Sequence, residues 1–283
     1  MLPIHKLIWH EWRARHEQPV RVPEPSETME DPEQIRAYVK AYEWGGPTSA
    51  LQLYHIGQLS TLIRPGDTVL DLACGPGPLL LELAALYPDC WFIGADLSRP
   101  MLDVLAQTCA ERGITNVRTL CEDIRELCGV EQGTVDVVIS TSALHHLPDS
   151  ESLGRVFGRL CDLLRPEGGV YLFDFGLVRS QATRDLLVAD VARKAPKVTA
   201  LDYHHSLRAA FVIDEVAALA SRHLPSRART ASSRFVDFLY VIRTPARVAP
   251  PFAVDSFVSA TTRRCGWGTR FERLMLETML RHH

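Results

Sequence analysis

Residues 69–78 read Val69-Leu70-Asp71-Leu72-Ala73-Cys74-Gly75-Pro76-Gly77-Pro78, and apolar side chains at helical spacing continue through residue 86. This pattern predicts a buried strand, a tight turn and a helix. Because glycine has no side chain, Gly75 and Gly77 let a ligand approach the backbone closely and allow unusual backbone angles. The first turn of the following helix adds free amide donors. The segment therefore predicts a ligand-binding turn at the end of a strand.

Beyond this turn, β-rich runs alternate with helical patterns. The runs are residues 68–73, 91–96, 117–121, 135–141 and 170–175, with helices expected near 78–87, 98–112 and 149–164. Four of the five runs are almost continuously apolar, as expected when helices cover both faces of a parallel sheet. The alternation predicts a doubly wound α/β sheet. Helices near 181–194 and 213–223 follow, and residues 234–243 have the alternation of an antiparallel strand near the sheet edge.

The two ends of the chain lie outside this alternation. A helix is expected from Ile4 to about His16, followed by a linker over residues 20–33, which hold three prolines and five acidic residues. Further helices are expected over 31–42 and 48–62, and one from about 271 to 281. We therefore expect an N-terminal helical extension or lid with its linker (1–47), an α/β domain (48–244) and a C-terminal appendage (245–283).

Composition limits the class of protein. Hydrophobic residues make up 46% of the chain and charged residues 23%, which is typical of a globular protein. No apolar run approaches the roughly 18 to 20 residues of a membrane helix, and the charged start does not resemble a secretory signal. The seven cysteines are scattered without a C-x-x-C pair, so we expect reduced thiols, a cytoplasmic location and no metal site.

The charge distribution is uneven along the chain. The formal net charge is −3, yet the residues from Arg222 onward hold eleven arginines and four acidic residues. No aromatic interleaving or RNA-binding signature accompanies these arginines, which favours a solvated surface. The net charge and this absence argue against nucleic acid as a partner.

The glycine turn fits one family of nucleotide-binding enzymes better than another. The G-x-G-x-x-G pattern of dinucleotide folds fails, because the sixth position counted from Gly75 is Leu80. With D-x-A-C-G-x-G at Asp71, Ala73, Gly75 and Gly77, the segment resembles the first motif of class I S-adenosylmethionine-dependent methyltransferases, in which glycine is commoner at position 73. The resemblance covers about residues 48–243 and implies a mostly parallel, Rossmann-like sheet of seven strands.

Three further segments carry the same resemblance. It implies that Asp96, at the end of the second strand, accepts from both ribose hydroxyls of the cofactor, with Leu97 and Met101 beside it. It also implies that Asp123 and Ile124 contact the adenine after the third strand. The segment Leu164-Arg165-Pro166-Glu167-Gly168-Gly169-Val170 resembles the family's turn into the fifth strand. The resemblance therefore implies S-adenosylmethionine as cofactor and S-adenosylhomocysteine as product.

Catalytic candidates lie in two polar segments. Ser140-Thr141-Ser142-Ala143-Leu144-His145-His146-Leu147-Pro148-Asp149 resembles the L-H-H-L-x-D segment of quinone-biosynthesis-like and other small-molecule methyltransferases. The resemblance implies that Ser140 and Thr141 border the methionine end of the cofactor. His145 is either a base facing the acceptor or a packing residue. Tyr203 and His204 lie in a second segment, inside residues 183–213, where the family often places an insertion that walls the acceptor site.

The main interpretation is a small-molecule methyltransferase. The N-P-P-[YF] motif and the Pro-Cys nucleophile of nucleic-acid methylation are absent after the fourth strand. Two alternatives stay open: a methyltransferase that acts on RNA or a peptide, or a protein that binds S-adenosylmethionine without methylating. The sequence leaves open the acceptor, the atom that is methylated and the oligomeric state, with a homodimer as one form.

Overall fold

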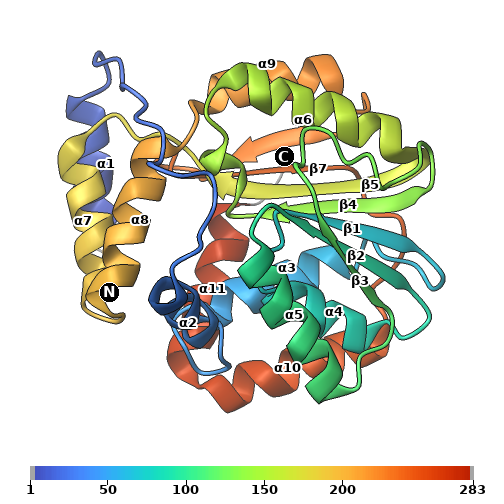
Figure 1. Ribbon diagram of the computed structural model, residues 1–283. Coiled ribbons are helices and arrows are strands. Elements are labelled where there is room, and N and C mark those ends of the chain that lie inside the picture. Colours follow the sequence, from blue (N-terminus) through green and yellow to red (C-terminus); the bar gives the residue numbers. More distant parts are fainter. Residues whose placement is uncertain (1–3, 281–283) are drawn as a thin grey trace.

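The computed structural model describes residues 4–280, and its centre is a seven-stranded sheet (Figure 1). The strands are β1 (Thr68–Leu72), β2 (Trp91–Asp96), β3 (Val117–Cys121), β4 (Val135–Thr141), β5 (Leu164–Phe175), β6 (Arg229–Ser232) and β7 (Leu239–Arg243). Their order is β3-β2-β1-β4-β5-β7-β6. β1 to β5 run parallel, and β7 is antiparallel to both β5 and β6. This confirms the predicted doubly wound, mostly parallel Rossmann-like sheet.

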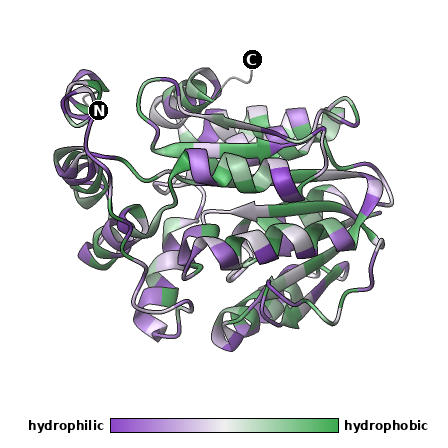
Figure 2. Cartoon of the chain, turned by 90° about the horizontal axis from the view of Figure 1, so that it is seen from above, coloured by the Kyte–Doolittle hydropathy of each residue, from purple (hydrophilic) through white to green (hydrophobic). Residues whose placement is uncertain are grey.

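Helices cover both faces of the sheet, as Figure 1 shows. On one side lie α6 (Ser150–Leu163) and α9 (Ile213–His223). On the other lie α3 (Ser49–Leu59), α4 (Pro78–Leu86), α5 (Arg99–Arg112), α10 (Phe252–Cys265) and α11 (Trp267–Met279). Successive residues of β4 belong to different cores: Val137 and Ile139 to the α3 side, and Val138 to the α6 side. Burial on both faces explains why the central strands are almost continuously apolar, as the sequence predicted. In Figure 2 much of the sheet is accordingly green, the colour of hydrophobic residues.

This side of the sheet differs from the prediction in three places: the start of β5, the extent of β7 and the presence of β6. β5 begins at Leu164 directly after α6, so Gly168 and Gly169 lie within the strand and not in a tight reversal. The expected strand over 234–243 is reduced to β7, because residues 233–238 form a connection from β6. β6 itself was missed, since its four residues, Arg-Thr-Ala-Ser, lack an apolar run.

The N-terminal extension lies along one flank of the domain. α1 (Ile4–Arg13) packs against α7 (Gln181–Ala192), and α2 (Pro32–Ala41) begins after the N-cap Asp31. α1 is shorter than predicted, and among its apolar residues only Leu7 is buried. Residues 20–30 have no helix or strand. They run across the domain, and we call them the strap.

Two helices were missed by the sequence patterns. α8 (Lys197–Ala209) occupies the polar segment predicted to lie between helices, and it packs against α7. α10 lies within the predicted appendage, and α11 begins at Trp267, earlier than expected. α10 and α11 pack on α3 and add Val254 and Val258 to the core on that side. The predicted helix end at Arg281 lies outside the described residues. Between residues 4 and 280, no helix combines the length and apolar character that a membrane crossing needs.

Candidate functional site

The turn after β1 has left-handed backbone at three positions. The φ angles are +52° at Ala73, +56° at Gly75 and +66° at Gly77. A side chain at Gly77 would meet Leu105 at 2.6 Å, and one at Gly75 would lie 3.1 Å from Met101 Sδ. Both glycines are therefore needed for conformation and for close packing on α5. Ala73 is the strained member of the turn, since alanine in the left-handed region costs about 1–2 kcal/mol.

Asp96 ties the end of β2 to this turn. Its Oδ2 accepts from the backbone N–H of Gly75 at 2.7 Å, and its Oδ1 accepts from the N–H of Ser98 at 2.8 Å. Burial raises the pKa of Asp96 while these backbone donors lower it, with a net rise. Asp71 is buried within β1. Its burial is the main cause, and the charge of the nearby Asp96 the second cause, of a pKa well above the ordinary value. Two carboxyl groups thus converge beneath the turn.

A pocket opens at the carboxyl ends of β1, β2 and β4, where the strand order reverses between β1 and β4. Such a switch point is the usual ligand site of doubly wound sheets. The predicted cofactor residues that line this pocket are Ala73, Gly75, Asp96, Leu97, Met101, Asp123 and Ile124. The pocket walls also include residues that the sequence did not single out: Glu27, Thr28, Met29, Tyr38, Ser98, Ser142, Ala143, His146 and Leu147.

Asp123 is held by a partner of its own. Arg125 donates to both carboxylate oxygens of Asp123 at 2.6–2.9 Å and also pairs with Glu27 of the strap at 2.9 Å. Burial would raise the pKa of Asp123, but the Arg125 hydrogen bonds outweigh it and lower the pKa. Asp123 is therefore a charged carboxylate at the pocket wall, and it links the strap to the domain through Arg125.

The last two residues of β4, Ser140 and Thr141, lie outside the pocket wall that they were predicted to border. Ser140 is fully buried, and its hydroxyl donates to the Leu72 carbonyl at 3.0 Å. Ser140 therefore joins β4 to β1, and neither it nor Thr141 is among the pocket-lining residues, which instead include Ser142, with a φ of +54°. Two further predicted residues, Asp71 and Gly77, support the turn from outside the pocket wall.

The two histidines occupy different positions in the short 3-10 helix η1 (Leu144–His146). His146 lines the pocket. His145 lies behind it, 2% exposed, with Nδ1 2.7 Å from Oδ1 of the fully buried Asp174. Asp174 also accepts from the His145 backbone N–H at 2.9 Å. The Asp174 carboxylate thus fixes the orientation of the His145 ring and leaves its Nε2 directed away from β5.

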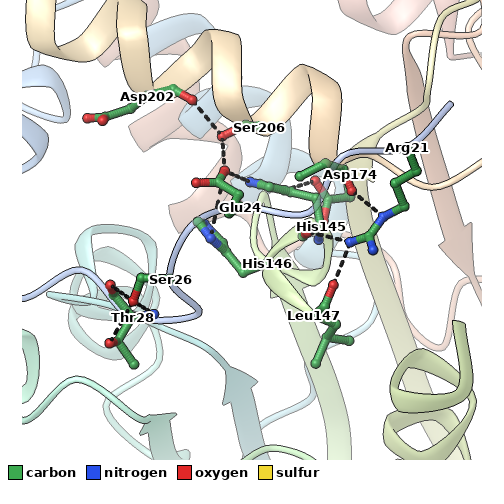
Figure 3. Close-up of polar contacts among 11 residues, drawn as sticks. Arg21, Glu24, Ser26, Thr28, His145, His146, Leu147, Asp174, Asp202 and Ser206 are labelled. Carbon is green, nitrogen blue, oxygen red and sulfur yellow. Dashed lines mark hydrogen bonds and ion pairs between the residues drawn. The ribbon is translucent and has the colours of Figure 1, made fainter. Parts of the chain in front are cut away.

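The strap brings a third group to the histidines. Glu24 Oε1 lies 3.6 Å from His145 Nε2 and 3.8 Å from His146 Nδ1, as Figure 3 shows. Ser206 of α8 donates to the same oxygen at 2.9 Å. Burial, followed by neighbouring His145, lowers the pKa of His146 to about 3, so this ring is neutral at ordinary pH.

Arg21 anchors the strap beside these histidines. Its guanidinium donates to the carbonyls of His145, Leu147, Pro148 and Ala209, and it lies 3.9 Å from the ring centre of Phe211. Further along the strap, the Met29 carbonyl accepts from the Ser98 hydroxyl at 2.7 Å. The predicted linker is therefore bound along its length to the pocket. One signal in the sequence could have indicated this binding. The linker has too few apolar residues to pack by hydrophobic burial, yet it carries the charged residues Arg21 and Glu24.

The other two catalytic candidates lie on α8. Tyr203 packs on Phe175, whose ring lies 5.2 Å from that of His145. His204 has Asp185 and Arg184 of α7 among its charged neighbours, and its pKa is lowered by burial and by Arg208. Neither is among the pocket-lining residues. Their catalytic roles stay predictions.

Comparison with known proteins agrees with this geometry. Residues 69–168, from β1 to the start of β5, match the family model described as methyltransferase domain. Trans-aconitate 2-methyltransferase of Deinococcus radiodurans is 36% identical over 126 residues, 44% of each chain. The 27-O-demethylrifamycin SV methyltransferase of Amycolatopsis mediterranei is 31% identical over 61% of this chain and 64% of its own length. The chain thus spans about half to two thirds of these relatives.

Solved structures share the whole fold at low sequence identity. The plantazolicin methyltransferase BamL, solved with a triazolic desmethylPZN analogue and SAH, has a TM-score of 0.58 at 14% identity, and the match covers 93% of this chain and 90% of that one. Such a likeness shows the fold alone, whereas the family match covers residues 69–168, which include the Gly75 turn, Asp96 and Asp123. Residues 69–168 therefore match the methyltransferase-domain family, and the chain has the fold of solved S-adenosylmethionine-dependent methyltransferases.

Proposed function

We propose that this chain transfers a methyl group from S-adenosylmethionine to a small-molecule acceptor. The observation that carries the proposal is the pocket at the β1–β4 switch point, where the Gly75 turn, Asp96 and Asp123 line one cavity. The names of the two relatives support a small acceptor, because both describe enzymes that methylate small molecules.

The pocket residues fit the proposed cofactor. Asp96 has carboxylate lone pairs left for ribose hydroxyls beyond the two backbone hydrogen bonds that it accepts. A side chain at Gly75 would point toward Met101, another residue of the pocket wall, and would take up space between them. Glycine at this position therefore leaves that space to a ligand. Asp123 and the backbone of Ile124 would hold the adenine edge, and Met101 would pack on its face. The cofactor, when bound, supplies a methyl group already activated on a sulfonium.

The protein's part in the reaction is alignment and exclusion of water. The strap contributes Glu27, Thr28 and Met29 to the pocket wall and is held closed by Arg21 and Arg125. We propose that it acts as the lid predicted for the N-terminal extension. The helix α1, in contrast, packs on α7. The acceptor would enter beside His146, where the polar atoms of His145, His146 and Glu24 converge.

We further propose a cytoplasmic location, supported by seven cysteines that are all free in the structure. The helices and strap that close the pocket support a small acceptor over RNA or a peptide. A homodimer stays a prediction from the sequence.

The proposed function is tested by incubating the purified chain with S-adenosylmethionine and a panel of hydroxyl, enol and carboxylic acid acceptors. We expect S-adenosylhomocysteine and a product heavier by one methylene, both detected by mass spectrometry, only when an accepted small molecule is present. Parallel incubations with RNA and with peptides test the alternative acceptors. Tight cofactor binding with no product from any acceptor would instead support a protein that binds the cofactor without methylating.

A further inference from the structure

The cluster beside the cofactor pocket has the composition of a metal site. Glu24, His145 and His146 each present one ligand-type atom, and the three atoms lie within 4.8 Å of one another. They come from the strap and from η1, which are far apart in the sequence. This distance explains why the sequence predicted no metal site: Glu24 arrives from the linker, which is remote from the histidines along the chain.

The spacing within the cluster is too long for hydrogen bonds and suits a shared cation. The Glu24 oxygen lies 3.6 Å and 3.8 Å from the two ring nitrogens, beyond the 2.7–3.2 Å of an N–H···O hydrogen bond. Two ligands held tetrahedrally at about 2.1 Å from one zinc ion lie roughly 3.4 Å apart. A small movement of the carboxylate would therefore close the site around a cation.

Both ring nitrogens are buried without a hydrogen-bond partner among the described residues. These atoms are His145 Nε2 and His146 Nδ1, and the His145 side chain is 2% exposed. Burying a polar atom without a partner is unfavourable, so the two converging nitrogens favour a ligand that both can bind.

The groups around the cluster are those that orient metal ligands. Asp174 lies 2.7 Å from His145 Nδ1, so that Nε2 points to the cluster. Ser206 donates to the Glu24 oxygen at 2.9 Å, and Figure 3 shows Glu24 between Ser206 and the two rings. A carboxylate behind a histidine ligand is the usual arrangement around bound metals, where it fixes the ring and its tautomer.

We propose that Glu24, His145 and His146 bind a divalent transition-metal cation, with Asp174 and Ser206 as the residues that position the ligands. Two neutral imidazoles and one carboxylate suit Zn²⁺ or Fe²⁺ and leave positions open for another ligand. Because Glu24 belongs to the strap, the cation joins the strap to η1 and stabilises the closed pocket. With a cation bound, His145 is a ligand and not the base that the sequence suggested.

Cation binding is measured with Zn²⁺ and, separately, anaerobic Fe²⁺, on full-length protein stripped by chelator, using calorimetry and elemental analysis. We expect one Zn²⁺ per chain. Glu24→Gln and His146→Ala should each weaken binding by at least about 100-fold, and Asp174→Asn by about 10- to 100-fold, the effect typical of a residue behind a ligand. Co²⁺ substitution adds a readout of geometry, because a tetrahedral site gives visible absorption that Glu24→Gln should remove. Stronger binding of Fe²⁺ than of Zn²⁺ would identify the preferred cation.

The matched control is His205→Ala, a histidine on α8 that lies outside the cluster and should leave Zn²⁺ affinity unchanged. Protease cleavage within residues 20–30 should be slowed by Zn²⁺ in the wild type and not in Glu24→Gln. Absence of stoichiometric Zn²⁺ and Fe²⁺ binding, or equal affinity in wild type and Glu24→Gln, would overturn the proposal. Cation binding is measured without cofactor or acceptor, so its failure is distinct from failure of methyl transfer.

Discussion

Nδ1 of His145 lies 2.7 Å from Oδ1 of Asp174, while the backbone N–H of the same histidine donates to Oδ2 at 2.9 Å. Both side chains are buried. One carboxylate at the end of β5 therefore holds both the backbone of η1 and the orientation of the ring that it carries. The position of η1 beside the pocket depends on this pair, and burial shields its hydrogen bonds from competition with water.

Asp174→Asn should lower the free energy of unfolding by about 2–4 kcal/mol. The asparagine NH2 group would replace one carboxylate oxygen, which accepts hydrogen bonds, and would face the nitrogens of His145. Urea unfolding followed by circular dichroism measures the loss. Asp202→Asn, on α8 at the edge of the same cluster, is the matched control and should change stability by less than about 0.5 kcal/mol. Equal stability of Asp174→Asn and wild type would show that the pair is not structurally coupled.

Ala73→Gly should stabilise the protein. Ala73 has a φ of +52°, and glycine relieves about 1–2 kcal/mol of left-handed strain while adding some entropy to the unfolded chain. We expect a net gain of about 0.5–1 kcal/mol in urea unfolding. Gly75→Ala, which introduces the same strain nearby and a contact with Met101, should have the opposite sign. A loss of stability in Ala73→Gly would contradict the strain assigned to this turn.

The sequence could predict those parts of the fold that depend on local pattern. β2, β3 and β4 have the predicted bounds because each β-rich run is closed by a polar residue or a turn. Asp96 and Gly75 could be placed together because parallel strands end at one edge of the sheet. Glu24 could not be placed, since no periodicity relates the strap to His145. α8 was missed because its polar residues, Tyr203 to Ser206, obscure the helical pattern.

The free energy of unfolding should fall as the pH is lowered, in part because of His55. Burial lowers the pKa of His55 to about 3, so the folded protein keeps this ring neutral while the unfolded chain binds a proton below about pH 6.5. The unfolded state therefore gains protons as pH falls, and this contribution to stability is lost between about pH 6.5 and 3. From pH 7.5 to 5.5, the wild type should lose about 1.4 kcal/mol more than His55→Gln. Identical pH dependence of unfolding in the two proteins would show that His55 titrates normally when folded.

Docking of α1 should depend on one side chain. Leu7 is 1% exposed, whereas neighbouring Ile8 is 37% exposed. Leu7→Ala should release α1 from α7 and increase protease cleavage near residues 14–20, with a stability loss of about 2 kcal/mol or more. Ile8→Ala, the matched control, should behave like wild type within about 0.5 kcal/mol. Similar cleavage of both variants would indicate that α1 is not held through Leu7.

The measurement that bears most directly on the proposed function is calorimetric binding of S-adenosylmethionine to wild type, Asp96→Ala and Asp103→Ala. Asp96 offers a charged acceptor for two ribose hydroxyls, each worth about 1.5–3 kcal/mol, whereas Asp103 is exposed on α5. Asp96→Ala should therefore weaken binding by at least about 100-fold, with Asp103→Ala unchanged and both variants folded by thermal unfolding. Unaltered affinity in folded Asp96→Ala, or no binding to the wild type, would contradict a cofactor site built from the Gly75 turn and Asp96.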